Sequence, residues 1–519
     1  MKLLRWCCIV SCAGWLAHAV GPAADKNATD FFGLTNVWSL HLKLSAADWD
    51  HLNPTEPARG DRPDRPDRPD RPDRPDRPEG PGRPPRPEFA PGDRPPPGGR
   101  PGGRPPGPPG PPHREFPWST ATVEFGPEVF TNVSVRFKGN SSFNGSRNSL
   151  KKPFKLDFDR QVPGRTFFGL EELLLNNNVN ELAHLREPLA YDAFRRADLP
   201  APRTAFVQVH LTVTGQFENR YLGLYTAVEP VEGDFLKHTF ATRHGLLVKP
   251  EGIRGLEYFG EDWHAYTNRY EVKSKLSSAS ARRLVDLTRF VHQASEAEFD
   301  AHLGDYLDVE STLRFVALNA LLANLDSFLG NGHNYYLFLP DKARPARFIP
   351  WDLNEAFGGH PMAGDSRAQA EFSVLQPTPP GNRFVGRLLA QPARAARYRE
   401  ICANLLTNAF NAPRLIADAE RIRQATAESL AREPRQPGRR GGPGFGPPEE
   451  RPEGARPPTD LPANRPAPND PMRRGRELPI AEWIQVRDAN VRAELAGQRT
   501  SPSPTLGHFP GGPPPPRPE

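Results

Sequence analysis

The chain has 519 residues, and 63 of them are Pro, a share of about 12% where roughly 5% is usual. Its 67 Lys and Arg nearly balance its 62 Asp and Glu, and the net charge of +5 includes no long basic run, which argues against nucleic acid as a partner. Most Pro lie in three segments, 54–117, 434–472 and 499–519, which excludes a single uniformly packed globule. The remainder has ordinary composition and is long enough for a two-lobed unit.

Residues 1–19 are typical of an export signal. A basic start, an apolar stretch over 6–16 and an A-x-A site ending at Ala19 predict cleavage there and an exported protein, secreted, periplasmic or held at the cell surface. Lipid attachment at Cys12, which follows a lipoprotein-type sequence, is the alternative. No later run of about 18 apolar residues occurs, so no transmembrane span is expected beyond the signal. Three of the four Cys lie in this leader, which excludes a disulfide framework.

A first strand is predicted at 38–44, where apolar and polar residues alternate. It precedes a Pro-rich block over 54–116 whose centre, residues 61–78, repeats the triplet Asp-Arg-Pro six times. A period of three matches polyproline II, and a segment with almost no aliphatic side chains cannot offset its ordering entropy. We therefore predict a disordered insertion between two strands, either an inert spacer or an arm that contacts the cell surface.

The patterns after this insertion change from strands to helices. Strands are predicted at 133–137, 154–158, 207–213 and 221–228, and a helix at 180–197. Further candidate helices are 278–293, 296–306, 310–325, 383–393, 395–410, 412–432 and 479–497, with short strands at 335–338 and 347–349. A second Pro-rich insertion is expected at 434–476 and a disordered tail at 499–519. This order predicts an α+β fold in which a β-rich lobe precedes a helical lobe, with a ligand cleft between them.

Two acidic motifs follow the predicted helix 310–325 and the predicted strand 347–349. Asp326 and Asn331 stand in the relation D-x-x-x-x-N, and Asp352 follows across a hairpin. An Asp, an Asn and a second Asp supply the oxygen ligands that a hard cation needs when it also binds phosphate. Alone, Asp326 could equally cap a loop. The three residues in order favour a metal site.

The third motif joins two predicted strands and reads Arg-Phe-Lys-Gly-Asn-Ser-Ser. Its Gly/Asn/Ser loop leaves backbone N–H groups free for an anion, so Gly139, Asn140 and Ser141 are candidate phosphate ligands. On the following strand the apolar residues share one face, which turns Lys155 to the other. Lys155 is the first choice for a phosphate-facing Lys and Lys152 the second. The alternative interpretation of these Lys is a solvated strand edge that prevents aggregation.

The three motifs, in this order, resemble the CotH family, which is named for a bacterial spore-coat protein and is related to atypical protein kinases. The resemblance rests on residues 136–142, 151–154, 324–336 and 350–358. It covers most of the globular part and leaves out the Pro-rich segments.

The resemblance implies a two-lobed, atypical kinase-like fold that binds ATP with Mg²⁺ or Mn²⁺ and transfers a phosphoryl group to Ser or Thr of an envelope or secreted protein. In that scheme Asp326 orients the acceptor hydroxyl and takes its proton. Asn331 and Asp352 bind the metal, and Lys155 holds the phosphates.

Further roles follow from the same resemblance. Glu187 or Glu181 is implied as the partner of the phosphate-facing Lys, and Glu229 as a hinge residue near the adenine. The implied domain spans 36–53 and 117–433, changes from the N-terminal to the C-terminal lobe near residue 270, and closes with a helix within 477–498.

A second function stays open on the sequence alone. A non-catalytic surface or assembly protein could retain the kinase-like fold, since ATP is scarce outside the cytoplasm and two long Pro-rich arms suit surface association.

Overall fold

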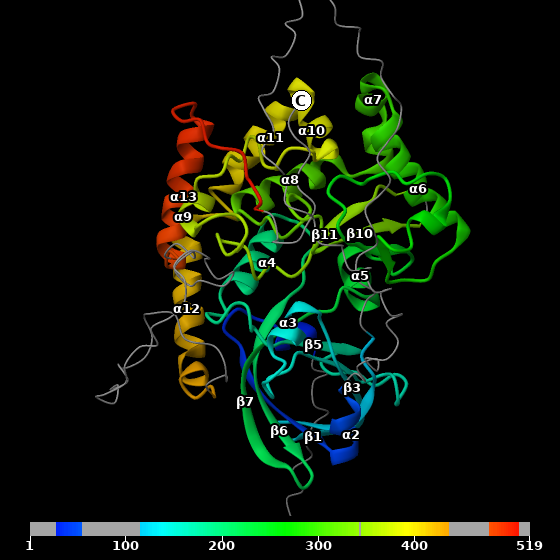
Figure 1. Cartoon of the computed structure of the whole chain (residues 1–519), viewed down its shortest axis with the longest axis vertical. Coiled ribbons are helices and arrows are strands. Elements are labelled where there is room, and N and C mark those ends of the chain that lie inside the picture. Colours follow the sequence, from blue (N-terminus) through cyan, green and yellow to red (C-terminus); the bar gives the residue numbers. More distant parts are fainter. Residues whose placement is uncertain (1–26, 54–114, 342–343, 435–476, 508–519) are drawn as a thin grey trace, which may run out of the picture.

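The computed structural model describes residues 27–53, 115–341, 344–434 and 477–507. In these residues the fold is mixed α+β, as predicted, and contains two β-sheets and a group of helices (Figure 1). The predicted signal peptide, Cys12 and the Pro-rich insertions lie outside the described residues, apart from short flanks of the insertions.

The first sheet closes into a barrel with the strand order β1-β2-β3-β4-β5-β7-β6. Its strands are β1 (Val37–Leu44), β2 (Ser119–Phe125), β3 (Glu128–Phe137), β4 (Phe154–Asp157), β5 (Glu172–Asn176), β6 (Thr204–Val213) and β7 (Phe217–Val228). Neighbouring strands of this sheet run antiparallel with one exception: β1 and β6 run parallel, from Val37 opposite Phe206 to Leu44 opposite Val213. Because β1 also pairs with β2, this parallel contact closes the barrel.

Alternation along the strands fills the barrel interior with apolar side chains. Phe137, Phe154 and Leu156 are fully buried there, while Arg136 and Lys155 between them form an outward-facing pair across β3 and β4. Three short helices accompany the barrel: α1 (Ala28–Phe31), α2 (Ala46–His51) and α3 (Ser141–Gly145).

The second sheet has the order β11-β10-β8-β9. The predicted hairpin forms β10 (Tyr335–Pro340) and β11 (Arg347–Pro350). Two strands that the sequence pattern did not indicate complete the sheet: β8 (Gly245–Pro250) pairs with β10, and β9 (Tyr270–Val272) pairs with β8. Both strands are short, and β8 has a continuous apolar run instead of an alternating one. The loop that carries Asp326 leads from α8 into the start of β10, and the loop that carries Asp352 follows the end of β11.

Helices make up most of the described residues after 277, and apart from α12 they lie mainly on the side of the second sheet away from the barrel (Figure 1). They are α6 (Ser278–Gln293), α7 (Glu296–Tyr306), α8 (Val309–Leu321), α9 (Ser366–Ala370), α10 (Arg383–Ala390), α11 (Pro392–Leu405), α12 (Ala412–Ala431) and α13 (Ile480–Leu495). Two more, α4 (Arg186–Arg196) and α5 (Gly233–Phe240), and a 3₁₀ turn at Trp263–Ala265 precede them.

Two predicted helices have different bounds for local reasons. The helix predicted at 180–197 begins only at Arg186, because His184 has a positive φ of 55° and the Glu181 carboxylate accepts the N–H groups of Leu185 and Arg186 at 3.1 and 3.3 Å. The helix predicted at 310–325 ends at Leu321, and Ala323 with φ 47° turns the chain into the loop that carries Asp326.

A polar contact surface joins α12 to the barrel, and we call it the α12 seam. Its centre is an ion pair at 2.5 Å between Nζ of the buried Lys151 and Oε1 of the half-buried Glu433. A hydrogen bond from the Tyr221 hydroxyl to the Ser429 carbonyl at 2.9 Å lies beside it. Gly223 has φ +127°, and a Cβ there would lie only 2.9 Å from the Glu433 carboxyl carbon. Figure 1 shows α12 running alongside β7. The seam therefore links the barrel to the helical part.

The last described residues return to the helical part. Residues 499–507, the start of the predicted tail, are hydrogen-bonded there: Ser373 N–H donates to the Pro502 carbonyl at 2.7 Å, and Gly507 N–H donates to the Met362 carbonyl at 2.7 Å.

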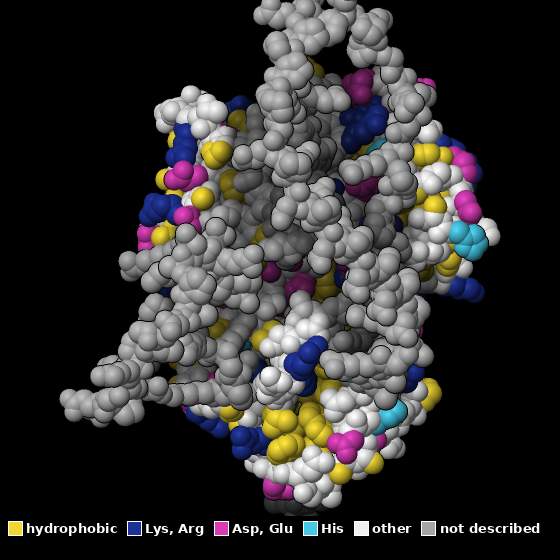
Figure 2. Space-filling model, viewed as in Figure 1, with side chains coloured by type: hydrophobic (Ala, Val, Ile, Leu, Met, Phe, Trp, Pro, Cys, Tyr) yellow, Lys and Arg dark blue, Asp and Glu magenta, His cyan; other side chains and the backbone are white. Residues whose placement is uncertain are grey.

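Figure 2 shows basic and acidic side chains interspersed over α13. Within the described part of the chain, no helix combines the length and apolarity that crossing a bilayer requires.

Candidate active site

Asp326 lies in a tight loop that follows α8. Its Oδ1 accepts a hydrogen bond from the Asn331 side chain at 3.0 Å, and its Oδ2 accepts one from Asn334 at 2.8 Å. The loop depends on two glycines: a Cβ at Gly330 would collide with the Leu325 carbonyl, and Gly332, with φ +74°, touches the Ile253 backbone. The loop therefore holds the Asp326 carboxylate in one orientation.

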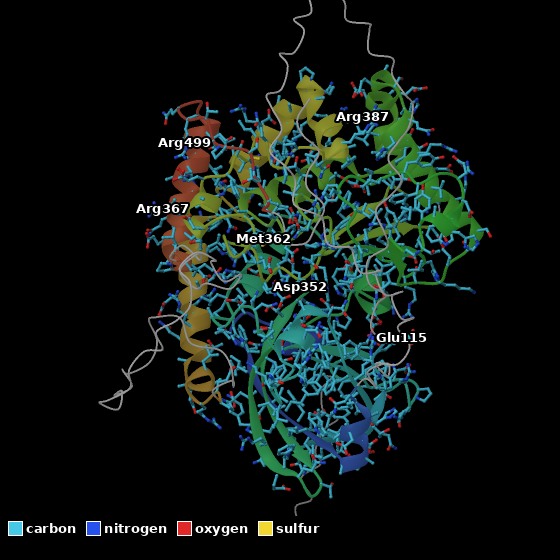
Figure 3. All side chains as sticks on the ribbon, in the orientation of Figure 1. Glu115, Asp352, Met362, Arg367, Arg387 and Arg499 are labelled. Carbon is cyan, nitrogen blue, oxygen red and sulfur yellow. The ribbon has the colours of Figure 1, made fainter. Side chains whose placement is uncertain are left out.

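Asp352 follows β11 directly and lies between the barrel and the helices (Figure 3). It adopts φ 48°, and its N–H donates to the Tyr191 hydroxyl on α4 at 3.0 Å. Burial and then the negative charge of Asp326 raise the pKa of Asp352, while Lys138 and Lys249 act in the opposite direction. The two predicted aspartates thus share one site.

Two further side chains that the sequence patterns did not indicate complete this site. Ligand atoms of Asp326, Glu355 and His360 all lie within 4.8 Å of one another. His360 is buried, its Nε2 lies 3.1 Å from the Asn331 amide nitrogen, and burial lowers its pKa. We refer to Asp326, Asn331, Asp352, Glu355 and His360 as the acidic cluster.

The acidic cluster suits a divalent cation on chemical grounds. Three of its members are carboxylates and one is an amide, the oxygen donors that Mg²⁺ and Mn²⁺ prefer. Burial and then the charge of Asp326 disfavour the ionised form of Asp352, and Lys138 and Lys249 oppose this effect. A metal ion would act in the same direction as these two lysines.

Lys138, just after β3, faces the acidic cluster, although the sequence patterns favoured two other lysines. Its Nζ donates to Asn176 Oδ1, and Asn176 Nδ2 donates to Glu187 Oε2 on α4 at 3.0 Å. Burial lowers the pKa of Lys138, and the charges of Asp352 and Glu187 oppose that shift. Glu187, one of the two predicted Lys partners, is therefore linked to Lys138 through Asn176, and Glu181 instead caps α4.

The two predicted phosphate-facing lysines have other partners. Lys155 forms ion pairs with Glu172 at 2.6 Å and Glu232 at 3.0 Å on the outer face of the barrel. Lys152 donates to the carbonyls of Ser146 and Arg147 at 2.7 and 2.9 Å, which ties down the end of α3. The structure does not bring Lys152 to the acidic cluster. Lys155 contributes a charge to the surroundings of Lys138 without contacting the cluster carboxylates.

The predicted phosphate loop is exposed and lies directly after Lys138. Gly139 has φ +71°, where a Cβ would collide with the Ser142 side chain, so the turn requires glycine. Asn140 makes no side-chain cap at the start of α3, which begins at Ser141. The loop is therefore open to solvent next to the cluster.

Glu229, the predicted hinge residue, follows β7 in the connection to α5. It is buried and bonds Arg203 through both oxygens, at 2.6 and 3.0 Å, and His238 at 2.8 Å. Burial alone would raise the pKa of Glu229, but the bonds from His238 and Arg203 lower it. Glu229 therefore anchors this connection through a buried ion pair.

Glu251, which follows β8, forms a second charged group with Lys249 of β8 and His333 of the Asp326 loop. Glu251 pairs with Lys249 at 2.6 Å and His333 at 2.7 Å. Burial alone would raise the pKa of Glu251, but these two partners lower it to about 2. Glu251 and Lys249 therefore compensate each other, unlike the cluster carboxylates.

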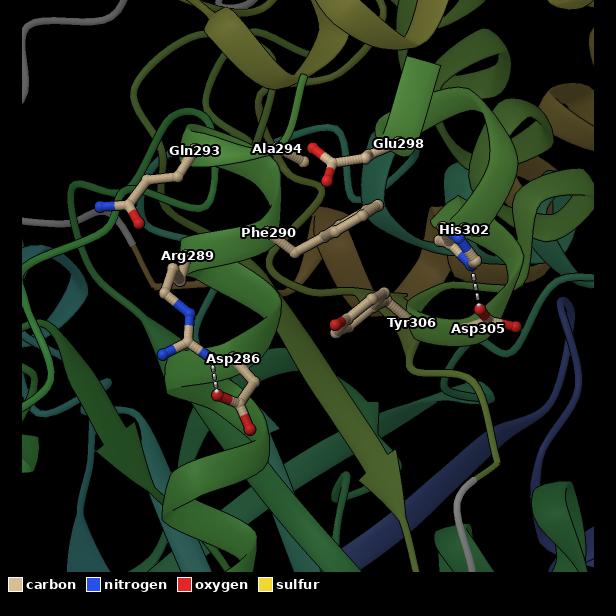
Figure 4. A pocket seen from close by; sticks show the side chains of 9 residues that line it. All are labelled: Asp286, Arg289, Phe290, Gln293, Ala294, Glu298, His302, Asp305 and Tyr306. Atoms are coloured by element: carbon tan, nitrogen blue, oxygen red, sulfur yellow. Dashed lines mark hydrogen bonds and ion pairs between the residues drawn. The ribbon is translucent and has the colours of Figure 1, made fainter. Parts of the chain in front are cut away.

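A hollow of about 430 Å³ lies elsewhere, between α6 and α7 (Figure 4). The stacked rings of Phe290 and Tyr306, 4.2 Å apart, form its floor. Its rim charges pair with each other, Asp286 with Arg289 at 2.5 Å and His302 with Asp305 at 3.0 Å. This hollow contains none of the predicted site residues.

Comparison with known proteins assigns the chain to a family. The family model for CotH kinase proteins matches residues 135–443. The chain belongs to the CotH kinase family. It is 24% identical over 306 residues, 57% of this chain and 80% of the relative, to the inner spore coat protein H of Bacillus subtilis (strain 168). The predicted family membership is therefore confirmed.

A solved structure, the Shewanella oneidensis MR-1 toxin–antitoxin complex of HipA, HipB and operator DNA, matches with 13% identity. The match covers 50% of this chain and 57% of that chain at a TM-score of 0.18, so the chain spans little more than half of it. No argument about fold or function rests on this match.

Proposed function

We propose that this protein is an exported phosphotransferase that moves the γ-phosphoryl group of ATP to a Ser or Thr hydroxyl of an envelope or secreted protein. The observation that carries the proposal is the acidic cluster, in which Asp326, Asn331 and Asp352 come together beside Lys138. CotH membership and the spore-coat name of the relative support a kinase-like protein outside the cytoplasm. In this proposal the barrel and the helical part act as the two lobes.

Asp326 is the residue that would accept the proton of the acceptor hydroxyl. Its carboxylate is oriented by Asn331 and Asn334 and keeps lone pairs free for that proton. The hydroxyl oxygen bonds to the γ-phosphorus while the bond from that phosphorus to the bridging oxygen breaks, and ADP leaves with the electron pair. A bound Mg²⁺ or Mn²⁺ would neutralise phosphate charge, held by Asn331, Asp352 and Glu355.

We assign the phosphate-facing role to Lys138 ahead of Lys155. Lys138 is linked through Asn176 to Glu187 and feels the charge of Asp352, whereas both ion pairs of Lys155 lie on the outer barrel face. The exposed loop at Gly139, Asn140 and Ser141 continues from Lys138, so its backbone N–H groups are placed to cover a phosphate. An adenine position near Glu229 remains part of the proposal.

A thermal-shift measurement with ATP and Mn²⁺ tests the proposal without a known acceptor. Ligand stabilisation follows RT ln(1 + [L]/Kd), about 2.7 kcal/mol at 100-fold excess over Kd. We expect wild type to be stabilised and Asp352→Asn to lose the shift. Asp305→Asn, an exposed residue on α7, serves as the matched control and should behave as wild type. Absence of both nucleotide binding and phosphate transfer in wild type would support the non-catalytic surface function instead.

A further inference from the structure

His360 belongs to the acidic cluster but has no part in the proposed transfer. It is 2% exposed, and Gln369 Nε2 donates to its carbonyl at 2.8 Å, so its backbone is anchored. One ring nitrogen, Nδ1, lies 3.1 Å from the Met362 backbone nitrogen and 3.6 Å from Glu355 Oε2, which is too far for a hydrogen bond. The other, Nε2, lies 3.1 Å from the amide end of Asn331. Both nitrogens therefore have assigned neighbours.

The Met362 contact determines which ring nitrogen carries the hydrogen. A backbone N–H can only donate, so Nδ1 must present its lone pair and accept. The ring is then neutral with its hydrogen on Nε2, because a hydrogen on Nδ1 would face the Met362 N–H. Nε2–H consequently points at the Asn331 amide as a donor.

Neither orientation of the Asn331 amide suits both of its neighbours in the absence of a cation. The same amide atom lies 3.1 Å from His360 Nε2 and 3.0 Å from Asp326 Oδ1. If it is the nitrogen, it donates to Asp326 but meets Nε2–H, another donor. If it is the oxygen, it accepts from His360 but faces a carboxylate oxygen. Amide nitrogen and oxygen exchange places by a half-turn and fill the same space.

A divalent cation removes the conflict in the second orientation. Oxygen ligands at 2.0–2.1 Å and right angles to each other are separated by about 2.9 Å, close to the 3.0 Å found between these two positions. Glu355 approaches the same place, since its ligand atom lies within 4.8 Å of those of Asp326 and His360.

We propose that His360 is a positioning residue for the metal: its Nε2–H holds the Asn331 amide oxygen toward Asp326, and these two oxygens form one edge of a divalent-cation site. The inference rests on the proposed function, which assigns Asn331 to the metal. It adds that Asp326 shares the cation with Asn331, and that His360 acts through Asn331 and is not itself a ligand, as groups that orient the ligands do in other metal sites.

Mn²⁺ titration of the full chain without nucleotide, followed by electron paramagnetic resonance, tests this role. Replacing His360 by Leu removes the donor and should raise the Mn²⁺ Kd about 10–100-fold. His360→Gln retains an N–H donor and should stay within about 3-fold of wild type. His292→Leu, on α6, is the matched control and should leave the Kd unchanged. Thermal unfolding without metal reports whether each variant is folded.

A double-mutant cycle separates positioning from a purely structural effect. Asp at position 331 presents an oxygen in either orientation, so His360→Leu in the Asn331→Asp background should change the Mn²⁺ Kd less than about 3-fold. An equal loss in both backgrounds would overturn the positioning role. Nitrogen coupling from an imidazole in the wild-type Mn²⁺ spectrum would overturn it too, by making His360 a ligand.

The result for wild type distinguishes the two levels of inference. If wild type binds Mn²⁺ and His360→Leu binds it equally well, the role of His360 fails and the proposed function stands. If wild type does not bind Mn²⁺ at all, the metal assignment of the proposed function fails together with the role of His360.

Discussion

The acidic cluster and the α12 seam are both buried and charged, but their charges are balanced differently. In the seam Lys151 pairs with Glu433, and toward the other end of α12 Asp418 bonds both Arg196 of α4 and Arg421. Burial opposes the shift, yet those two arginines lower the pKa of Asp418. In the cluster, burial and a neighbouring carboxylate raise the pKa of Asp352. Paired charges in the seam hold two parts of the fold together, whereas the cluster brings three carboxylates together, and the proposed function assigns a cation to them.

This difference also separates the lysines. The sequence predicts Lys155 and Lys152 as phosphate-facing residues, yet the ammonium groups of Lys152 and its neighbour Lys151 bond protein partners that anchor α3 and α12. Lys138 belongs to the Arg-Phe-Lys-Gly-Asn-Ser-Ser motif, and its charge interacts with the Asp352 carboxylate of the cluster. A lysine near a predicted site is therefore best judged by the partners of its ammonium group.

The largest expected effect is on the seam. Lys151→Met removes one partner of a buried ion pair and leaves the Glu433 charge unpaired, which should lower the free energy of unfolding by about 3–5 kcal/mol. Urea denaturation measures the change. Arg423→Ala, which breaks the exposed pair with Glu420, is the control and should cost less than about 1 kcal/mol. Equal effects of the two changes would contradict the contrast drawn here.

Two carboxylates outside the cluster, Glu181 at the start of α4 and Asp418 on α12, should respond to pH with opposite signs. Burial raises the pKa of Glu181, at the start of α4, to about 7, so between its unfolded pKa near 4.3 and pH 7 the folded state binds more protons than the unfolded state. The free energy of unfolding then falls as pH rises, by at most about 4 kcal/mol from this residue. Urea titrations at pH 5 and 8 should show that Glu181→Gln, which keeps an acceptor for α4, flattens this loss.

Asp418 supplies the opposite case for the same titration. Its lowered folded pKa stabilises the protein above the unfolded value near 3.9, and that stability is lost as pH falls through the folded pKa. Asp418→Asn should therefore weaken the loss of stability in acid and leave the slope between pH 5 and 8 unchanged. A changed slope in that range would argue that the titrations of Glu181 and Asp418 are not independent.

Replacement of Lys138 and of Lys155 should affect phosphate transfer to different degrees. Lys138→Met should reduce phosphate transfer or nucleotide affinity about 100-fold, the scale of losing one aligned electrostatic contact. Lys155→Met should change either by less than about 10-fold, because Lys155 already pairs with Glu172 and Glu232. The reverse order would return the phosphate-facing role to Lys155.

The smallest effect concerns the metal-free cluster. Asp352→Asn removes a carboxylate that burial and Asp326 disfavour, so without metal the variant should be more stable than wild type by about 0.5–2 kcal/mol. Thermal unfolding in excess chelator measures this. A clear loss of stability would mean that cations compensate the cluster charge more fully than the geometry suggests.

Local patterns predicted the α+β class, most helices of the C-terminal half and the hairpin that leads to Asp352. They failed where the outcome depends on residues distant in sequence. The direction of Lys138 depends on Asn176 in β5, and His360 joins Asn331 only because the chain folds back after Phe357. The same holds for β8, whose pairing partner is β10.

The parallel pairing of β1 with β6 has a consequence for how this chain assembles. Contacts between residues so far apart in sequence form slowly, and a nascent chain emerges from its N-terminus first. One edge of β1 must therefore wait, unpaired, until Thr204–Val213 has been made. A fragment that stops before β6 leaves this edge free to bind other strands, so it should aggregate, whereas a fragment that includes β7 can complete the barrel.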